Sequence, residues 1–318
     1  MNVRTAPADG VADLITRLAN SACQQNVLVL GALNVDTILY VRTFPEIDSA
    51  IVVDDLERLP GGHAGNCAAA LAVLGVNVRI IAAVGDDTDG RLLIADLVQA
   101  GVDVSKIRIL SDAPTGQVYI PTSGSKHYML LARGANDRLT VNVVEEVTAS
   151  RATAVVLFDP PRDVLLQVER LSQLAIDRPT IYWCPGPINA GNEELVSALL
   201  EHTDVLVVNE VEGAAIECAI GALRCSEVVT THGARGASLV AGRERYSVPG
   251  HVVDVVDSIG SGDAFIAAYC VSKQAGLLRS VSLSLANGSG ALAATSAGAR
   301  GCLATTRSLV DFVYGGGS

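Results

Sequence analysis

The sequence predicts an α/β fold in which helices cover both faces of a doubly wound, mostly parallel sheet. From residue 152 onward, short apolar segments alternate with helical segments, an order typical of parallel strands joined by crossover helices. The apolar segments are continuous, as in strands that are buried on both faces. Hydrophobic residues make up 49% of the 318-residue chain and aromatic residues only 4%, so we expect small aliphatic side chains to build the interior.

The chain begins with an extension, residues 1–26, in which we expect a short amphipathic helix with Asp9 as a candidate N-cap. Apolar residues recur there at helical spacing, namely Val11, Leu14, Ile15 and Leu18. A partly ordered tail is the alternative interpretation. The main domain is expected over residues 27–314.

Elements of the main domain are predicted from apolar runs and turn residues. The first half predicts a strand at 27–33, β-rich segments at 37–41 and 50–56, a helix at 67–74, a strand at 78–84, a helix at 90–99, and a hairpin of 115–121 with 126–132. The second half predicts parallel strands at 154–158, 180–183, 205–208 and 228–230, an antiparallel edge hairpin of 236–240 with 244–248, a strand-like run at 252–256, and helices at 264–271, 284–295 and 308–314.

The composition excludes several classes of function. A formal net charge of −11 argues against a nucleic-acid-binding surface. No apolar run is long enough to span a membrane, and the first residues lack a continuous hydrophobic signal core. The seven cysteines are odd in number and form no Cys-x-x-Cys motif, which favours reduced thiols. We therefore expect a soluble, cytoplasmic protein with no nucleic-acid or membrane partner.

The glycine-rich turn Gly260-Ser261-Gly262-Asp263 is the strongest functional signal in the sequence. Glycines let the backbone turn tightly with its N–H groups facing one point, and a helix that begins near Gly262 adds the positive end of its dipole. The turn is therefore an anion cradle with a carboxylate at its edge. Phosphoryl transfer needs both parts, because donors must stabilise the negative charge and a base must accept a proton. A glycine turn capped by an aspartate is the alternative interpretation.

A second glycine cluster, Pro60-Gly61-Gly62-His63-Ala64-Gly65-Asn66, leads into the Ala-rich segment 67–74. Together, the two clusters resemble the paired signatures of the ribokinase-like carbohydrate kinases, the PfkB family. The resemblance covers about residues 27–314. It implies a ribokinase-like fold with a small β-lid over the substrate, built from strands of residues 37–56 and 115–132. These segments are too short to form a core of their own, so we expect a homodimer in which two lids cover each other's apolar faces.

The resemblance implies a catalytic turn and a sugar site. Asp263 would take the proton from the hydroxyl that is phosphorylated, and Gly260, Ser261 and Gly262 would form the anion hole. The residues that match the family's sugar contacts are Asn34, Asp36, Gly61, Gly62, His63, Asn66 and Asp159. A carboxylate at a strand end suits sugar hydroxyls, because each hydrogen bond it accepts is charge-assisted. His63 departs from the family, since ribokinase has a lysine there.

The resemblance also implies sites for ATP, Mg²⁺ and K⁺. The residues implied at the nucleotide and Mg²⁺ are Asn209, Glu212, Thr231, Gly233, Gly236 and Asn287. Asn209 and Glu212 match an Asn-x-x-Glu motif that organises Mg²⁺ through water, which suits an ion that keeps several waters, although a helix cap has the same pattern. The residues implied around the monovalent cation are Asp257, Ile259, Ala293, Ser296, Gly298 and Cys302. Cys302 stands where ribokinase has a serine.

We therefore expect an ATP-dependent phosphotransferase, a carbohydrate kinase that phosphorylates a hydroxyl, expected to be primary, of a small sugar. A nucleoside kinase of the same family is the first alternative. A non-catalytic sugar-binding sensor is an alternative of another class, against which the presence of Asp263 with Asn209 and Glu212 argues, since a sensor needs no base. Pyridoxal-type kinases on the related fold lack the Gly-Gly-x-x-x-Asn cluster. The Asp-x-Asn-x-Arg pattern of fructokinases is absent near Trp183.

Overall fold

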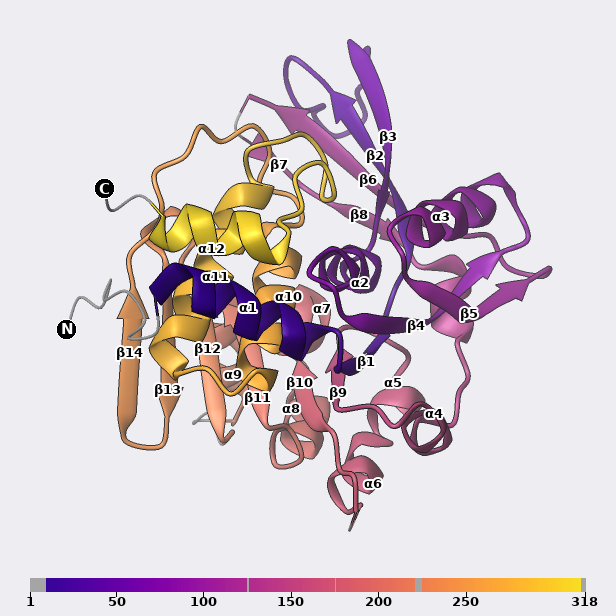
Figure 1. The fold of residues 1–318 in the computed structure, drawn as a ribbon. Helices are drawn as coiled ribbons and strands as arrows, with labels where there is room; N and C mark the ends of the chain where they lie inside the picture. The colour runs from indigo at the N-terminus through magenta and orange to yellow at the C-terminus, as the bar shows by residue number, and fades with distance from the viewer. Residues whose placement is uncertain (1–9, 125, 175, 221–224, 316–318) are drawn as a thin grey trace.

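The computed structural model describes residues 10–124, 126–174, 176–220 and 225–315, which form two sheets and the helices around them (Figure 1). The larger sheet has nine strands in the order β14-β13-β12-β11-β10-β9-β1-β4-β5. The strands from β12 to β5 are parallel, and β13 and β14 form the predicted antiparallel edge hairpin. The bounds are β1 Asn26–Leu30, β4 Asn77–Gly85, β5 Asp103–Leu110, β9 Ala154–Leu157, β10 Thr180–Trp183, β11 Val205–Asn209, β12 Glu227–Thr231, β13 Ala237–Ala241 and β14 Glu244–Val248.

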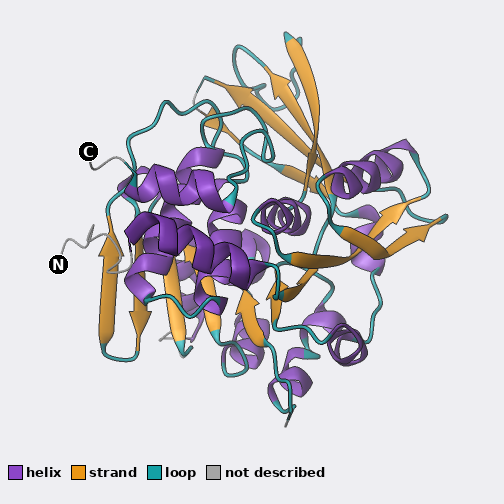
Figure 2. Cartoon of the chain, viewed as in Figure 1, coloured by secondary structure: helices purple, strands orange, loops and turns teal. Residues whose placement is uncertain are grey.

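Alternate side chains of the strands enter two separate cores. In β1, Val27 and Val29 face one core, while Leu28 and Leu30 face the other. The first core is covered by α1 Gly10–Ala22, α2 His63–Val73, α3 Thr88–Gln99, α10 Ser261–Gln274, α11 Arg279–Ala293 and α12 Thr306–Tyr314. The second is covered by α4 Val143–Ser150, α5 Arg162–Leu165, α6 Val168–Ser172, α7 Gly186–Ala190, α8 Glu193–Leu200 and α9 Glu210–Ile220. Helices therefore cover both faces of the sheet, as predicted (Figure 2).

The smaller sheet is the lid, which we define as β2 Asn34–Tyr40, β3 Asp55–Gly61, β6 Gly116–Ser123, β7 Lys126–His127 and β8 Leu130–Ala132. Its first strand, β2, follows β1 after a short connection, so the lid rises from the carboxyl end of the large sheet (Figure 1). The central strand β2 pairs with β3 in antiparallel and with β6 in parallel orientation. The hairpin turn expected at residues 123–125 includes position 125, which lies outside the described residues.

Within the N-terminal extension, α1 packs on α12 and α10 (Figure 1). Leu14, Leu18 and Ala22 of α1 are buried in the first core. The Arg17 guanidinium donates to the carbonyls of Ala275 and Gly276, at 3.3 and 3.1 Å, just after α10 ends. This helix therefore supports the far end of the helix that carries Asp263. The candidate cap Asp9 lies outside the described residues.

The structure corrects several expected elements. Residues 252–256 form no strand, because the N–H of Val256 bonds to the Ala294 carbonyl beyond α11, at 2.9 Å, instead of to a neighbouring strand. Strand β3 lies at 55–61 and not at 50–56, because pairing with β2 places Gly61 opposite Asn34. Strand β5, an edge strand of mixed polarity, was not predicted. The helices α2 and α10 begin earlier than expected, inside the two glycine clusters.

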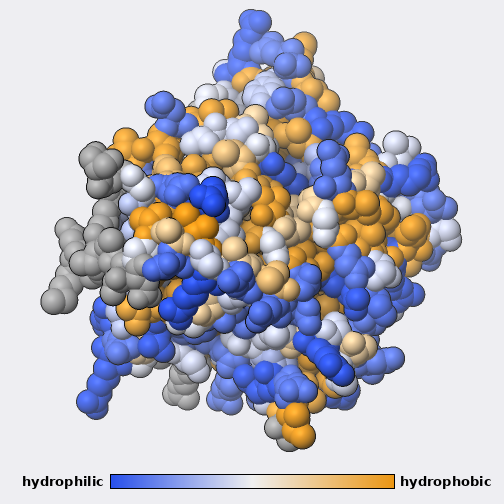
Figure 3. Space-filling model, viewed as in Figure 1, coloured by the Kyte–Doolittle hydropathy of each residue, from blue (hydrophilic) through white to orange (hydrophobic). Residues whose placement is uncertain are grey.

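Within the described ranges, no helix combines the length and the apolar character needed for a membrane span. All seven cysteines are free thiols. Hydrophobic patches interrupt the hydrophilic surface at the lid and near α3 (Figure 3). On α3 they include Leu92 and Val98, which are 44% and 55% exposed.

Candidate active site

A cavity of about 130 Å³ lies at the carboxyl ends of the parallel strands, where a doubly wound sheet places its ligands. Gly262 and Asp263 reach it from the start of α10, and His63 from the start of α2. The ends of β11 and β12 and the first turn of α9 contribute Asn209, Thr231 and Glu212. Residues predicted from separate motifs, for the base and for the nucleotide, therefore line one space.

Asp263 is held at both carboxylate oxygens and is 3% exposed. Asn66 Nδ2 donates to its Oδ2 at 2.9 Å, and His63 Nδ1 lies 2.9 Å from its Oδ1. The negative charge of Asp263 raises the pKa of His63, which favours the imidazolium. The His63 side chain is 58% exposed and stacks on the buried Phe158 ring, with 6.0 Å between centroids. One oxygen of Asp263 thus has a buried partner and the other a solvent-facing partner.

The glycine turn before Asp263 has the shape of an anion cradle. Gly260 adopts φ +77°, and a Cβ there would stand 2.4 Å from the Cβ of Ala299, so this position requires glycine. A Cβ at Gly262 would instead meet nothing within 4 Å, which leaves open space above the first turn of α10. The N–H groups of that turn have no intrahelical acceptor, and Ser261 Oγ is buried without a partner in the described structure. The turn therefore fits a phosphate group.

On the lid, Asp36 faces the site as a buried, unpaired carboxylate. It is 8% exposed and has no hydrogen-bond or ion-pair partner among the described residues. Burial raises the pKa of Asp36 to about 7. A Cβ at Gly61 would lie 2.2 Å from Asp36 Oδ2, so Gly61 makes room for this carboxylate. Gly62 has φ +86° and directly precedes α2.

Asn34 and Asp159 are tied to residues that the sequence interpretation missed. Asn34 Oδ1 accepts from Nδ2 of the buried Asn136 at 2.9 Å, and no described residue accepts from the Asn34 amide N–H groups. Asp159 Oδ2 accepts from Arg133 at 2.9 Å, and its Oδ1 from the Ala32 N–H at 3.2 Å. Neither Asn136 nor Arg133 belongs to a local motif, because each acts on a partner distant in the sequence.

On the nucleotide side, Asn209 and Glu212 form a reciprocal cap at the start of α9. Glu212 N–H donates to Asn209 Oδ1 at 2.9 Å, and Asn209 N–H donates to Glu212 Oε2 at 3.1 Å. Burial raises the pKa of Glu212, whose charge is thus poorly solvated without a cation. The pair is therefore a helix cap and also lines the cavity.

The remaining residues predicted at the nucleotide lie near β12 and α11. Gly233 has φ +58° with open space at its Cβ position, whereas a Cβ at Gly236 would lie 2.0 Å from the Val248 carbonyl oxygen. Only Gly236 is therefore required by the protein's own packing. The Asn287 side chain donates to the Pro249 carbonyl at 2.9 Å and so fixes the chain that follows β14.

The loops predicted around a monovalent cation are bridged by Asp257. Its Oδ1 accepts from the Ile259 N–H at 2.9 Å, and its Oδ2 from the Gly298 N–H at 3.0 Å. The remaining predicted residues lie at the end of α11 or between α11 and α12, and these are Ala293, Ser296 and Cys302. The glycine turn rests on this loop through Gly260 and Ala299, so the loop supports the anion cradle.

Comparison with known proteins agrees with this arrangement. The family described as pfkB family carbohydrate kinase matches residues 24–306. This chain belongs to the pfkB family of carbohydrate kinases. An ATP-dependent ribose-1-phosphate kinase from Halopiger xanaduensis is 32% identical over 280 residues, which cover 86% of this chain and 93% of that protein. A ribokinase from Bacillus subtilis is 25% identical over 298 residues, which cover 91% and 99%.

Solved structures share the fold of this kinase. A Burkholderia thailandensis nucleoside kinase in complex with inosine superposes with a TM-score of 0.82 at 22% identity, and covers 91% of this chain and 99% of its own. An Arabidopsis thaliana ribokinase complexed with ribose and ATP gives a TM-score of 0.78 at 22% identity, with 91% and 98% covered. The expected ribokinase-like fold and the expected carbohydrate kinase are therefore confirmed.

Proposed function

We propose that this kinase transfers the γ-phosphoryl group of ATP to the primary hydroxyl of a small sugar. One observation carries the proposal, namely that Asp263 and Gly262 share a cavity with Asn209, Glu212 and Thr231. A base for the acceptor hydroxyl and groups suited to nucleotide phosphates must meet at the point where the phosphoryl group is transferred.

Asp263 is the proposed general base. Its Oδ1 takes the proton of the acceptor hydroxyl while the hydroxyl oxygen attacks the γ-phosphorus, and the bond from that phosphorus to the leaving ADP oxygen breaks. In the structure, His63 Nδ1 contacts Asp263 Oδ1. The His63 side chain is largely exposed, however, and can move aside without opening the core. Asn66 meanwhile keeps Oδ2 in place.

The cradle formed by Gly260, Ser261 and Gly262 is proposed to bind the transferring phosphoryl group. Asn209 and Glu212 would hold Mg²⁺ through water, and the ion would supply positive charge to the nucleotide phosphates. The loops joined by Asp257 would hold K⁺ through backbone carbonyls beside the cradle. The residues proposed to line the nucleotide itself are Thr231, Gly233, Gly236 and Asn287, and those proposed around K⁺ are Asp257, Ile259, Ala293, Ser296, Gly298 and Cys302.

The sugar is proposed to lie between the lid and α2. The Asp36 carboxylate has no protein partner and so can accept two sugar hydroxyls, while the free amide N–H groups of Asn34 donate to hydroxyl oxygens. Gly61 and Gly62 let the ring approach the backbone closely. Asp159 would contact the sugar only if Arg133 released one of its oxygens.

A nucleoside is the second candidate acceptor. In the lid register, Val118 lies opposite both Asp36 and Leu131, so all three side chains are on the same face of the sheet. Leu131 is 45% exposed, which leaves apolar surface beside Asp36 on which a base could pack. The nucleoside kinase bound to inosine shares the fold.

A substrate panel tests both candidates. Wild type and Asp263→Asn are incubated with ATP, Mg²⁺ and K⁺, and ADP release is measured with pentoses, hexoses, sugar phosphates and nucleosides. We expect turnover with one class of acceptor in wild type and little in the variant. Thermal shifts by a sugar without turnover by any panel member would favour the sugar-binding sensor instead.

We also propose that the lid mediates a homodimer. Its strands and loops carry half-exposed or exposed apolar side chains that a second copy would cover, namely Tyr40, Ile47, Ile51, Val52, Val53, Leu56, Tyr119, Tyr128, Met129, Leu130 and Leu131. Light scattering at micromolar concentration should then give twice the mass of one chain, and a monomer in the presence of substrate would contradict the proposal.

A further inference from the structure

Arg300 connects the loop after α11 to the catalytic carboxylate through a chain of side chains. It lies between α11 and α12, and its side chain is only 11% exposed. Its Nε donates to Asn66 Oδ1 at 3.1 Å, its Nη2 to the Gly61 carbonyl at 3.4 Å, and its Nη1 pairs with Asp96 of α3. The planar guanidinium thus fixes three partners at once, which a lysine ammonium on a flexible stem holds less rigidly.

This contact decides which way the Asn66 amide points. A guanidinium has only donors, so the Asn66 atom that faces Arg300 must be the oxygen. The other end of the amide is then the NH₂ group, which donates to Asp263 Oδ2 at 2.9 Å. Arg300 and Asp263 therefore favour the same orientation of the Asn66 amide, and without Arg300 only the repulsion between the amide oxygen and the carboxylate would oppose a flip.

We propose that Arg300 is a positioning residue for phosphoryl transfer, because it locks Asn66 as a donor to Asp263 Oδ2 and so presents Oδ1 to the acceptor hydroxyl. The inference rests on the proposed function, in which Asp263 is the base. The two oxygens of Asp263 are unequal as this role requires. Oδ2 is held by the buried Asn66, while Oδ1 meets the exposed His63, whose place a substrate hydroxyl can take.

The backbone near the site makes room for this side chain. A Cβ at Gly65 would stand 2.4 Å from Arg300 Nη2 and 2.7 Å from Leu33 Cδ2, although Gly65 lies within α2 and has an ordinary helical conformation. Glycine inside a helix costs about 0.5–1 kcal/mol relative to alanine. The Arg300 guanidinium and the Leu33 side chain, which both lie against this turn of α2, together account for the glycine at position 65.

A purely structural role for Arg300 is the competing explanation, because its ion pair with Asp96 joins the loop after α11 to α3. The two roles differ in how Arg300 and Asn66 combine. If Arg300 acts through Asn66, replacing Arg300 should not lower kcat further in a variant that already lacks the Asn66 side chain. If Arg300 only holds the loop after α11 against α3, the decreases in kcat caused by the two single substitutions should add in the double variant.

A double-mutant cycle tests the proposal. We measure kcat and both KM values for wild type, Arg300→Met, Asn66→Ala and the double variant, with the best acceptor from the panel. Loss of a hydrogen bond to a charged group corresponds to roughly a 10- to 150-fold effect. We therefore expect Arg300→Met to lower kcat by about 10-fold or more, with the KM for ATP changed by less than about threefold. The double variant should be no slower than Asn66→Ala.

Asp96→Asn is the matched control, because it removes the ion pair but leaves Asn66 its donor. We expect it to lower Tm with kcat within about threefold of wild type. Additive losses in the cycle, or an Asp96→Asn variant as slow as Arg300→Met, would overturn the proposal. If Arg300→Met does not fold, Gly65→Ala displaces the guanidinium and replaces it in the cycle, with the same two outcomes.

The cycle also separates this inference from the proposed function. An active wild type with an inactive Asp263→Asn and a normal Arg300→Met refutes only the role of Arg300. An Asp263→Asn variant as active as wild type refutes the proposed base itself.

Discussion

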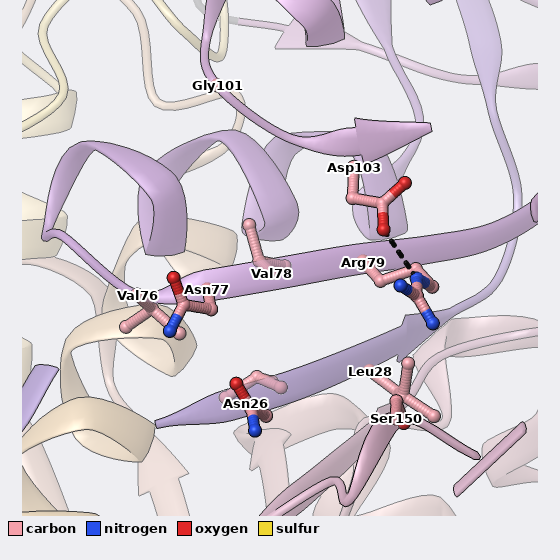
Figure 4. A pocket seen from close by; sticks show the side chains of 10 residues that line it. Asn26, Leu28, Val76, Asn77, Val78, Arg79, Gly101, Asp103 and Ser150 are labelled. Atoms are coloured by element: carbon pink, nitrogen blue, oxygen red, sulfur yellow. Dashed lines mark hydrogen bonds and ion pairs between the residues drawn. The ribbon is translucent and has the colours of Figure 1, made fainter. Parts of the chain in front are cut away.

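The two ends of the large sheet both carry hollows lined by polar side chains, and the hollow that holds Asp263 is smaller than the hollow at the opposite end. At the amino ends of β1 and β4, a hollow of about 310 Å³ is lined by Asn26, Asn77, Arg79 and Asp103 (Figure 4). At the carboxyl ends, the cavity at Asp263 measures about 130 Å³. Volume alone therefore does not identify the cavity that holds Asp263, since a hollow of about 740 Å³ also lies between the lid and the start of α3.

The two hollows differ in whether the polar groups near them have hydrogen-bond or ion-pair partners. At the amino ends, Arg79 Nε pairs with Asp103 at 2.6 Å and Asn77 donates to the Cys23 carbonyl at 2.9 Å. Near the carboxyl ends, Asp36 has no partner in the described structure and Ser261 Oγ is buried alone. Buried polar groups without partners cost stability, so Asp36 and Ser261 fit a site where a ligand supplies the missing partners.

The largest expected effect on turnover comes from replacing one aspartate by asparagine at the carboxyl end of the sheet, compared with the same replacement at the amino end. Asp263→Asn keeps the shape of the side chain and removes the base, so turnover should fall by roughly 10²–10⁴-fold. Binding of an ATP analogue, measured by calorimetry, should survive. Asp103→Asn at the opposite end is the control and should keep wild-type turnover. An Asp263→Asn variant with near-normal turnover would remove Asp263 from the mechanism.

Asp36→Ala should give the next largest effect. It takes away the charged acceptor for sugar hydroxyls, and such a hydrogen bond contributes about 1.5–3 kcal/mol, which corresponds to a loss of roughly 10- to 150-fold in kcat/KM. Steady-state kinetics with the sugar and ATP varied in turn would measure it. The KM for ATP should change little, and an equal change for both substrates would show that Asp36 does not act on the sugar alone.

The Asp36 carboxyl should also lower the free energy of unfolding when it is ionised, so its effect on stability depends on pH. Burial raises its pKa from 3.8 to about 7, so between these values the folded protein binds the proton more tightly than the unfolded chain. Stability from this group is therefore present at low pH and lost as the pH rises through 7. We expect Asp36→Asn to raise Tm at pH 8 by about 2 °C or more, and the gain to shrink toward pH 4. A gain independent of pH in thermal unfolding would contradict this linkage.

The smallest effect is expected at the amino end. The Arg79–Asp103 pair is partly exposed, at 30% and 40%, and such pairs contribute about 0–1 kcal/mol. Arg79→Ala should therefore lower the free energy of unfolding by no more than about 1 kcal/mol in urea titrations, and kcat should be unchanged. A clear loss of turnover would show that the two ends of the sheet are coupled.

Sequence patterns predicted most of the scaffold correctly. Continuous apolar runs predicted the buried parallel strands because burial on both faces leaves no place for polar residues. The apolar pattern gave wrong predictions for segments that are exposed to solvent. The edge strand β5 mixes charged and apolar residues, and the apolar run at 252–256 lies on the surface, with Val252 fully exposed. Hydrophobicity is thus an indirect indicator both of burial and of strand pairing.

The sequence by itself determined the family and the fold class and located the glycine turn, because these depend on neighbouring residues and on local backbone geometry. Only the tertiary structure decided which polar groups are paired. Asn66 and Asp263 are 197 positions apart, and Arg300 and Asn66 are 234 apart. Asn136 likewise fixes Asn34 across the chain. Such contacts arise when helices and loops pack at the edge of a completed sheet, so no local pattern contains them.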